Sequence, residues 1–226
     1  MREIVFDTET TGLDPLQGHR VVEIGCVELM NHIATGQVFH AYLNPERPVP
    51  TEAAMVHGLS DEFLADKPVF AEVVDDFLSF IGDARLVAHN AMFDLNFINA
   101  ELTRTGFKIL AKDRAIDTVA IARKKYPGAP ASLDALCKRF NVNLADRKLH
   151  GALLDARLLA EVYLELCGGR QPGLAMGVET AAVEAEAATL RQRQFRPPRP
   201  HAPTEDELLA HETFLTHIRE PLWKRA

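Results

Sequence analysis

The sequence has few cysteines, no long apolar run and no excess of positive charge. Its three cysteines, Cys26, Cys137 and Cys167, are widely spaced and odd in number. They suggest neither a disulfide framework nor a metal-binding cysteine motif, and they fit a reducing compartment. No apolar run approaches the ~18 residues of a membrane span, and Met1-Arg2-Glu3 leads directly into a predicted strand. We therefore expect a cytoplasmic protein without a signal peptide or membrane span.

The net charge of −7 argues against a protein that coats nucleic acid non-specifically. It does not argue against an enzyme that reaches phosphates through metal ions. With 226 residues, of which 47% are hydrophobic, the chain can form one domain with a sizeable core and an additional segment.

The stretch from Ile4 to Leu13 (IVFDTETTGL) contains the first candidate site. Residues 4–6 predict a buried strand, and Asp7 and Glu9 follow two positions apart. Because side chains alternate along a strand, both carboxylates are expected on one face. A hard cation with oxygen ligands would offset their repulsion. The alternative is an ordinary surface pair of acids at a strand end.

The pattern of the first 169 residues predicts an α/β fold with a mixed sheet. Segments 20–29 and 38–43 predict a hairpin whose loop is 31–36. Short strands are expected at 86–88 and 115–116. Helical periodicity and capping signals predict helices over 51–57, 69–81, 91–105, 119–125, 132–140 and 151–167.

Two further candidates lie near predicted helix starts. Asp94 falls in the first turn of a helix for which Asn90 is the expected N-cap, where a surface carboxylate would also be stabilised by the helix dipole. His150 and Asp155 cannot share a helix face, because five helical steps rotate by about 140°. Gly151 resolves this if His150 lies on the loop and folds back towards Asp155, although an ordinary loop histidine is the alternative.

Three motifs together resemble the DEDDh (DnaQ-like) 3′→5′ exonuclease family. They are FDTETTG at 6–12, HNAMFD at 89–94 and HGALLDA at 150–156. The resemblance covers residues 3 to about 169 and implies a ribonuclease H-like fold. In that fold, helices flank a mixed five-stranded sheet, here with a flexible C-terminal tail. Within the family, the chain most resembles the epsilon proofreading subunits of bacterial DNA polymerase III.

The resemblance also implies a mechanism that depends on two divalent metal ions, Mg²⁺ or Mn²⁺. It assigns direct metal contacts to Asp7, Glu9 and Asp155, and contact with the second metal to Asp94. His150 would be the general base, a role that suits imidazole because it titrates near neutral pH.

Substrate contacts are implied at the metal site and beside it. The full set is Asp7, Glu9, Thr10, Gly12, Leu13, Glu52, His57 and Asp155. For Glu52 and His57, the alternatives are a glutamate on a helix face and a histidine that interacts with a helix end. Asp117 and Thr118 are expected to cap a helix rather than bind metal, and His89 and Asn90 are expected to shape the site.

The chain after the predicted nuclease domain (1–169) divides into two predicted segments. Residues 170–203 combine a clamp-binding peptide, with Gln171, Leu174 and Met176 as contacts, and a mobile linker rich in arginine and proline. Pro172-Gly173 departs from the clamp motif, so weak binding is expected. Residues 204–226 form the predicted polymerase-binding segment: a capping box at Thr204 and Glu207 begins a helix that Pro221 ends near Glu220. Its expected contacts are Leu208, Leu215, Ile218, Leu222 and Trp223.

The predicted function is a proofreading subunit that removes mispaired 3′-terminal nucleotides as 5′-monophosphates. Its expected partners are the DNA polymerase III alpha subunit, weakly the beta sliding clamp, and the single-stranded 3′ end of primer DNA. The resemblance leaves open a small accessory subunit. Two alternatives are an RNA-trimming enzyme of the same fold, because a 2′-hydroxyl contact cannot be read from sequence, and a non-catalytic scaffold, which would be expected to have lost a metal ligand.

Overall fold

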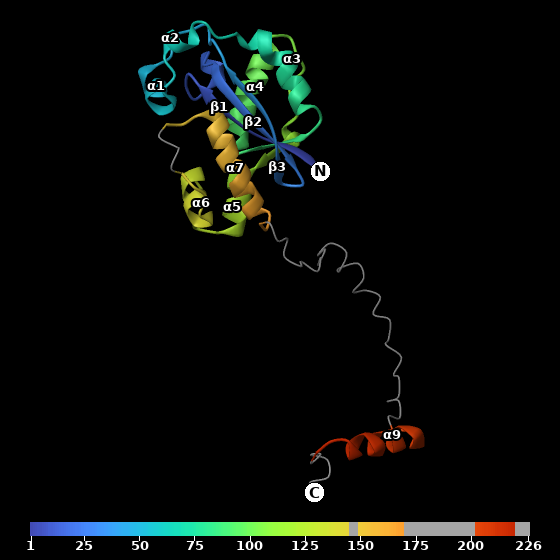
Figure 1. The fold of residues 1–226 in the computed structure, drawn as a ribbon. Helices are drawn as coiled ribbons and strands as arrows, with labels where there is room; N and C mark the ends of the chain where they lie inside the picture. Colours follow the sequence, from blue (N-terminus) through green and yellow to red (C-terminus); the bar gives the residue numbers. More distant parts are fainter. Residues whose placement is uncertain (145–148, 170–201, 220–226) are drawn as a thin grey trace, which may run out of the picture. The chain divides into compact units, whose positions relative to one another are not determined.

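The computed structural model describes residues 1–144, 149–169 and 202–219. The chain divides into two units, Met1–Ala175 and Met176–Ala226, which are described separately. The first unit contains a five-stranded sheet of order β3-β2-β1-β4-β5 (Figure 1). Its strands are β1 (Arg2–Thr10), β2 (Val21–Met30), β3 (Ile33–Tyr42), β4 (Arg85–Ala88) and β5 (Ala115–Asp117). Strand β1 pairs antiparallel with β2 and parallel with β4, so the predicted mixed sheet is confirmed.

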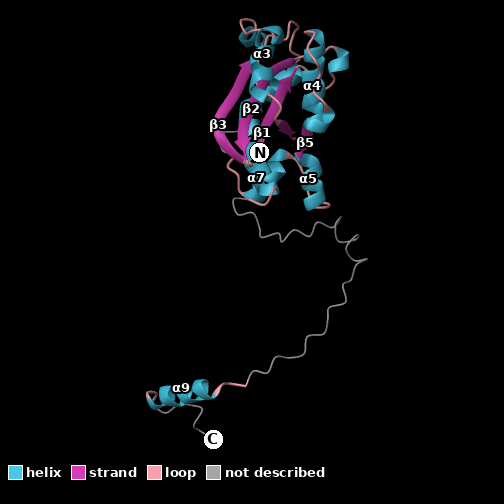
Figure 2. Ribbon diagram, turned by 90° about the vertical axis from the view of Figure 1, so that its right-hand side faces the viewer, coloured by secondary structure: helices cyan, strands magenta, loops and turns pink. Residues whose placement is uncertain are grey.

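The hairpin between β2 and β3 is tighter than the sequence pattern predicts. Its turn consists of Asn31 and His32, both with positive φ, which suits a two-residue hairpin turn. The expected loop over 31–36 is therefore wrong, because β3 already begins at Ile33. β3 is an edge strand and its first half is exposed, so no apolar alternation marks it (Figure 2).

The predicted helices of the first unit are confirmed, with ends that shift by a residue or two. They are α1 (Thr51–His57), α3 (Phe70–Ile81), α4 (Ala91–Arg104), α5 (Thr118–Lys125), α6 (Leu133–Phe140) and α7 (Ala152–Leu166). The short helix α2 (Asp61–Leu64) and the 3₁₀ turns η1 (Pro15–Gln17) and η2 (Lys112–Arg114) were not predicted. None of the described helices is long and apolar enough to cross a membrane.

Side-chain alternation along β1 divides the core into two layers. Ile4 and Phe6 pack with α3 and α4 on one face of the sheet. Val5 lies on the other face, in a cluster with residues of α5, α6 and α7. Helix α7 runs across β1 and β2 on this second face (Figure 1). Each face of the sheet is therefore covered by helices, and any side chain at an odd position of β1 points towards α7.

Gly25 allows the start of α7 to lie directly on the sheet. Gly25 pairs with Asp7 across β1 and β2. A Cβ atom at this position would overlap the backbone of Ala152 and Leu153. Only glycine permits this close approach, which places the first turn of α7 opposite Asp7. The sequence analysis missed this role, although a glycine inside a strand pattern is a recognised signal for such contact.

The described part of the second unit is helix α9 (Glu205–Thr216). The predicted capping box is confirmed, because Thr204 Oγ1 accepts from the Glu207 N–H and the Glu207 carboxylate accepts from the Thr204 N–H. The helix ends at Thr216, so the predicted end near Glu220 is wrong. Leu215 is buried, whereas Leu208 is about half exposed. Gln171, Leu174, Met176, Leu222 and Trp223 lie outside the described residues.

Candidate active site

Asp7 and Glu9 lie on the α7 side of the sheet, near the end of β1. Asp7 is paired with Gly25 and Glu9 with Glu23 across the two antiparallel strands. Glu9 is buried and Asp7 is half-buried. The structure therefore confirms that the two carboxylates share a face, but both belong to the strand itself, which extends to Thr10. The predicted strand at 4–6 was too short.

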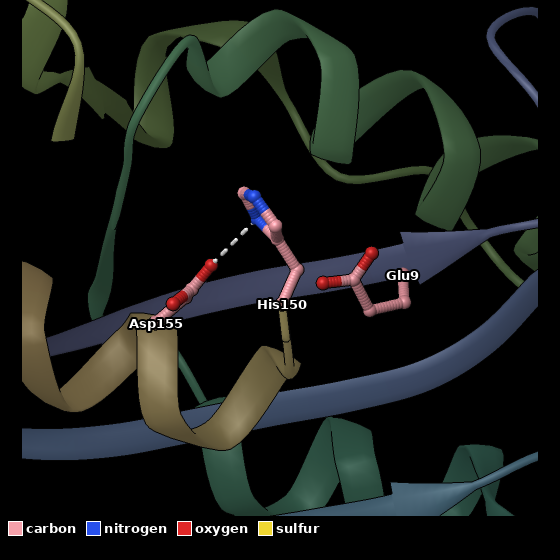
Figure 3. A group of neighbouring side chains, drawn as sticks. All are labelled: Glu9, His150 and Asp155. Atoms are coloured by element: carbon pink, nitrogen blue, oxygen red, sulfur yellow. Dashed lines mark ion pairs between the residues drawn. The ribbon is translucent and has the colours of Figure 1, made fainter. Parts of the chain in front are cut away.

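His150 folds back towards Asp155, as the loop position of His150 predicts. Asp155 is in the first turn of α7 and its side chain is buried, whereas the His150 side chain is about half exposed. His150 Nδ1 lies 3.2 Å from Asp155 Oδ2 (Figure 3). The backbone N–H of His150 donates to the Val56 carbonyl, which ties this loop to α1.

Glu9, His150 and Asp155 form a group of possible metal ligands among the described residues. One ligand atom from each lies within 4.8 Å of the other two. The residues come from β1, from the loop before α7 and from α7 itself (Figure 3). Two carboxylates and an imidazole are donors suited to a divalent cation. The arrangement in space fits a cation site, with Glu9 and Asp155 as the acidic donors.

Asp94 reaches the same cleft from the opposite side of β1. It lies in the first turn of α4 and is buried. Asp94 Oδ1 accepts hydrogen bonds from the Thr8 N–H at 3.0 Å and from the Thr8 hydroxyl at 2.7 Å. Thr8 alternates with Asp7 and Glu9, so it points towards α4. The structure therefore brings Asp7, Glu9, Asp94, His150 and Asp155 to one cleft of about 850 Å³.

The turn between β4 and α4 is held by the start of α5. Asn90 occupies the N-cap position of α4 but has a φ of 71° and makes no side-chain capping bond, so its predicted capping role is wrong. Its backbone N–H instead donates to Asp117 Oδ1 at 3.0 Å. The same oxygen accepts from the Val119 N–H at 2.9 Å, which confirms Asp117 as the cap of α5. His89 Nδ1 contacts the Thr118 hydroxyl at 2.9 Å. These contacts fix the turn that carries Asp94.

Crowding of carboxylates raises their affinity for protons. Burial raises the pKa of Asp7 well above its ordinary value, and the charges of Asp94, Glu9 and Asp155 raise it further. Burial also raises the pKa of Asp94 to about 7, although its two hydrogen bonds from Thr8 oppose the shift. Positive charge in this cleft would relieve the repulsion, which is a second reason that the site fits divalent metal.

A second cleft of about 620 Å³ adjoins the first and contains the other predicted contact residues. Thr8, Glu9 and Phe93 line both clefts. The predicted substrate-contacting residues that line the second cleft are Glu9, Thr10, Gly12, Leu13, Glu52 and His57. Leu13 is 84% exposed at its edge. The fold thus places the predicted contact residues of the 10–13 loop and those of α1 in one cleft beside Glu9.

His57 is the most buried of the predicted contacts on α1. Its Nδ1 accepts from the Leu59 N–H at 3.0 Å, so the ring proton is on Nε2 when the imidazole is neutral. Burial lowers the pKa of His57, against the opposing effects of Glu23 and the Thr10 carbonyl. Nε2 is itself buried and lies against the backbone of Thr10, so His57 joins α1 to the Thr10–Leu13 loop in the wall of the second cleft.

Sequence analysis did not identify His19 as part of the second cleft. A Cβ at Gly12 would overlap the His19 imidazole, so glycine is required for the ring to pack against this loop. The His19 ring also contacts the Thr11 hydroxyl at 3.2 Å. The glycine after two threonines indicated a turn, but its partner lies seven residues further on and has no signal of its own.

Comparisons with known proteins agree with the site. A family model described as exonuclease matches residues 4–163. DNA polymerase III subunit epsilon of Rickettsia conorii is 52% identical over 223 residues, which cover 96% of each chain. The solved structure of exonuclease X in complex with 5′-overhanging duplex DNA is 27% identical, with a TM-score of 0.56 over 73% of this chain and 90% of that one. The nuclease domain of 3′hExo, a DEDDh family member bound to rAMP, shares the fold at 17% identity and a TM-score of 0.62, over 73% of this chain and 90% of that one.

The stability of the metal-free protein should fall as the pH rises. The pKa of Asp94 is raised from its ordinary 3.8 to about 7, so between these values the folded protein holds a proton that the unfolded chain has lost. The free energy of unfolding then decreases from about pH 4 to pH 7. The contribution of Asp94 to this decrease is on the order of 4 kcal/mol at most, because one pKa unit is worth about 1.4 kcal/mol. Urea denaturation with a chelator present measures it.

The matched variant is Asp94→Asn, which keeps the Oδ1 atom that accepts both bonds from Thr8 but cannot titrate. The part of the pH dependence that Asp94 contributes should disappear in this variant, leaving the contribution of Asp7, which has the same sign. Added Mg²⁺ should also flatten the wild-type curve, because a bound cation favours the charged carboxylates. A slope in Asp94→Asn equal to that of the wild type would contradict this assignment.

Proposed function

Because the chain belongs to the exonuclease family, and within it to the DNA polymerase III epsilon subunits, we propose that this cleft carries out the hydrolysis by which the protein proofreads. The protein is a 3′→5′ exonuclease that acts within the DNA polymerase III complex on DNA. The observation that carries the proposed site is the convergence of four carboxylates and one histidine on a single cleft.

The two adjoining clefts suggest how a strand would lie. The second cleft would hold the 3′-terminal nucleotide between the Thr10–Leu13 loop and the α1 residues Glu52 and His57. His57 and Glu52 both line this cleft, so they would lie beside that nucleotide. The scissile phosphate would then lie at the junction of the clefts, beside Glu9. A frayed, mispaired end enters such a site more readily than a paired end, which supplies selectivity.

Asp7, Glu9 and Asp155 would hold the divalent metal ions directly, with Asp94 contributing to the second. Mg²⁺ and Mn²⁺ are the expected ions, because the donors are mainly carboxylates. When bound, such ions would polarise the scissile phosphate and offset charge that develops on the attacking and leaving oxygens. Asp94 is positioned by Thr8, so its role depends on the β1–α4 contact.

His150 would accept the proton of the attacking water. Its contact with Asp155 favours the tautomer in which Nδ1 carries the proton, because the Nδ1–H can then donate a hydrogen bond to the carboxylate. Nε2 is then the basic nitrogen. The half-exposed position of the side chain on a loop allows the ring to face solvent and substrate, while the bond from its backbone N–H to Val56 restrains the loop.

The function is tested by digestion of DNA with a mispaired 3′ end, beside a paired DNA end and an RNA strand of equal sequence. We expect Mg²⁺-dependent release of 5′-monophosphates, fastest from the mispaired DNA. Asp7→Ala combined with Glu9→Ala should abolish hydrolysis and leave the fold intact, or even raise the metal-free melting temperature, because repulsion is removed. More than a few per cent of residual activity in this double variant would refute the metal assignment. A preference of the wild-type protein for RNA would contradict the assignment of DNA as the substrate.

Replacement of the proposed base gives a separate prediction. His150→Ala should lower kcat by ~10²–10⁴, the usual contribution of a general base, with metal binding largely kept. His150→Gln should restore little, because an amide cannot take up the proton. The measurement is the single-turnover rate at saturating Mg²⁺, with metal affinity determined by calorimetry. A wild-type rate for His150→Ala at pH 7 would place the base elsewhere.

We infer that the C-terminal part of the chain connects the nuclease domain (1–169) to the rest of the complex. Residues 204–226 are proposed to bind the polymerase (alpha) subunit. The capped helix α9 supports this, because Leu208, Leu209 and Phe214 are exposed on it. Residues 170–203 would hold the weak clamp-binding peptide. A small accessory subunit remains a further candidate partner.

Truncation after residue 203 tests the proposed tail. The truncated chain should no longer co-purify with the alpha subunit, yet should hydrolyse free single strands at the wild-type rate. Trp223→Ala in the full chain should weaken the complex by ~2 kcal/mol or more, because buried tryptophans dominate many interfaces. Clamp binding by the isolated protein should be micromolar or weaker. Full affinity of the truncated chain for alpha would place the interface in the nuclease domain.

A further inference from the structure

The first cleft continues beyond the acidic cluster to the cationic side chain of Arg123. The cleft is lined by six carboxylates, those of Asp7, Glu9, Asp94, Asp117, Asp134 and Asp155. Among the lining residues that the structure describes, Arg123 in the last turn of α5 is the one arginine or lysine. All of these residues belong to the described part of the chain. An arginine that faces an otherwise acidic cleft calls for an explanation in terms of an anionic ligand.

The side chain of Arg123 makes no polar contact that would stabilise the fold within the described part of the chain. Its side chain is exposed, and within the described residues no ion pair or hydrogen bond involves it. Neighbouring cations do have structural partners. Lys125 Nζ donates to the carbonyls of Glu165 and Leu166 at 3.1 and 2.9 Å. The guanidinium of Arg139 lies 4.4 Å from the centre of the Tyr126 ring.

These partners hold α5 in place and leave Arg123 directed to the cleft. Lys125 ties the end of α5 to the end of α7, the helix that carries Asp155. The start of α5 is fixed by Asp117, which also binds the β4–α4 turn. The helix that presents Arg123 is therefore braced at both ends against the elements that carry Asp94 and Asp155. Its distance from the cluster is set by the fold rather than by a loose loop.

The order of the clefts identifies the ligand. In the proposed function, the 3′-terminal nucleotide occupies the second cleft and the scissile phosphate lies at the junction beside Glu9. The nucleotides on the 5′ side must then pass through the first cleft. Metal ions would offset the charge of the scissile phosphate, but the next phosphates along the strand would still face the carboxylates of that cleft.

We propose that Arg123 binds a phosphodiester of the substrate strand on the 5′ side of the scissile bond. This inference rests on the proposed function and extends it to the longer substrate. A guanidinium forms paired hydrogen bonds with phosphate oxygens, so it both attracts the strand and sets its register. Because the contact is to the backbone, it adds affinity without sequence preference.

The test compares two substrates that differ in this phosphate. One is a single-stranded oligodeoxynucleotide. The other is the p-nitrophenyl ester of thymidine 5′-monophosphate, which has a hydrolysable phosphate and one nucleoside but no further phosphodiester. Arg123→Ala, Arg123→Lys and the control Lys124→Ala are compared with the wild type in the full chain. Lys124 is the exposed neighbour on the same helix and does not line the cleft.

For Arg123→Ala, we expect the ratio of kcat/KM for the oligonucleotide to kcat/KM for the ester to fall about tenfold, through KM of the oligonucleotide. The slope of log KM against the logarithm of the salt concentration should decrease by about 0.7, the value for one phosphate contact on a single strand. Arg123→Lys should keep the salt slope and recover part of the ratio. Lys124→Ala should match the wild type in both measurements.

Two results would overturn the assignment. One is an unchanged ratio and salt slope in Arg123→Ala, and the other is an equal loss on both substrates, which would mean that Arg123 only supports the fold of the site. Failure of the proposed function is distinguishable, because the wild-type protein would then hydrolyse neither substrate.

Discussion

Repulsion among carboxylates at one end of the sheet is the constraint on which the site depends. Asp7, Glu9, Asp94 and Asp155 converge there in a largely buried setting, and burial and mutual repulsion raise the pKa of Asp7. A folded chain tolerates such crowding only if the surrounding structure holds the side chains in place or a cation offsets their charge. Hydrogen bonds from Thr8 to Asp94 and the contact between His150 and Asp155 supply part of that restraint.

The fold delivers these side chains from both faces of one strand. Odd positions of β1 point to α7 and supply Asp7 and Glu9, while Thr8 points to α4 and holds Asp94. Gly25 permits α7 to approach close enough for Asp155 to complete the group. Asp117 then links the β4–α4 turn to α5, so that the acidic cluster and Arg123 belong to one braced framework. The proposed metal site and the proposed path of the DNA strand thus depend on the same structural contacts.

Much of this architecture could be predicted because its signals are local. The alternation of Asp7 and Glu9 along β1 and the periodicity and capping signals of the helices depend on residues only a few positions apart, and these helices were found within a residue or two of where they were expected. The errors occurred where that signal is weak or misleading. The exposed edge strand β3 has no apolar alternation at its start. Asn90 adopts a left-handed conformation in which its backbone N–H binds Asp117, a residue far away in sequence.

The sequence by itself determined the identities, order and chemistry of the acids and of His150, because three motifs with fixed internal spacing specify them. It also determined the alternation that puts Asp7 and Glu9 on one face. Only the tertiary structure decided the rest. The hydrogen bonds from Thr8 to Asp94, the contact of α7 with Gly25 and the position of Arg123 in the acidic cleft each join separate elements. They result from the packing of helices on both faces of the sheet, and the identity of the partner in each contact cannot be read from residues that are close in sequence.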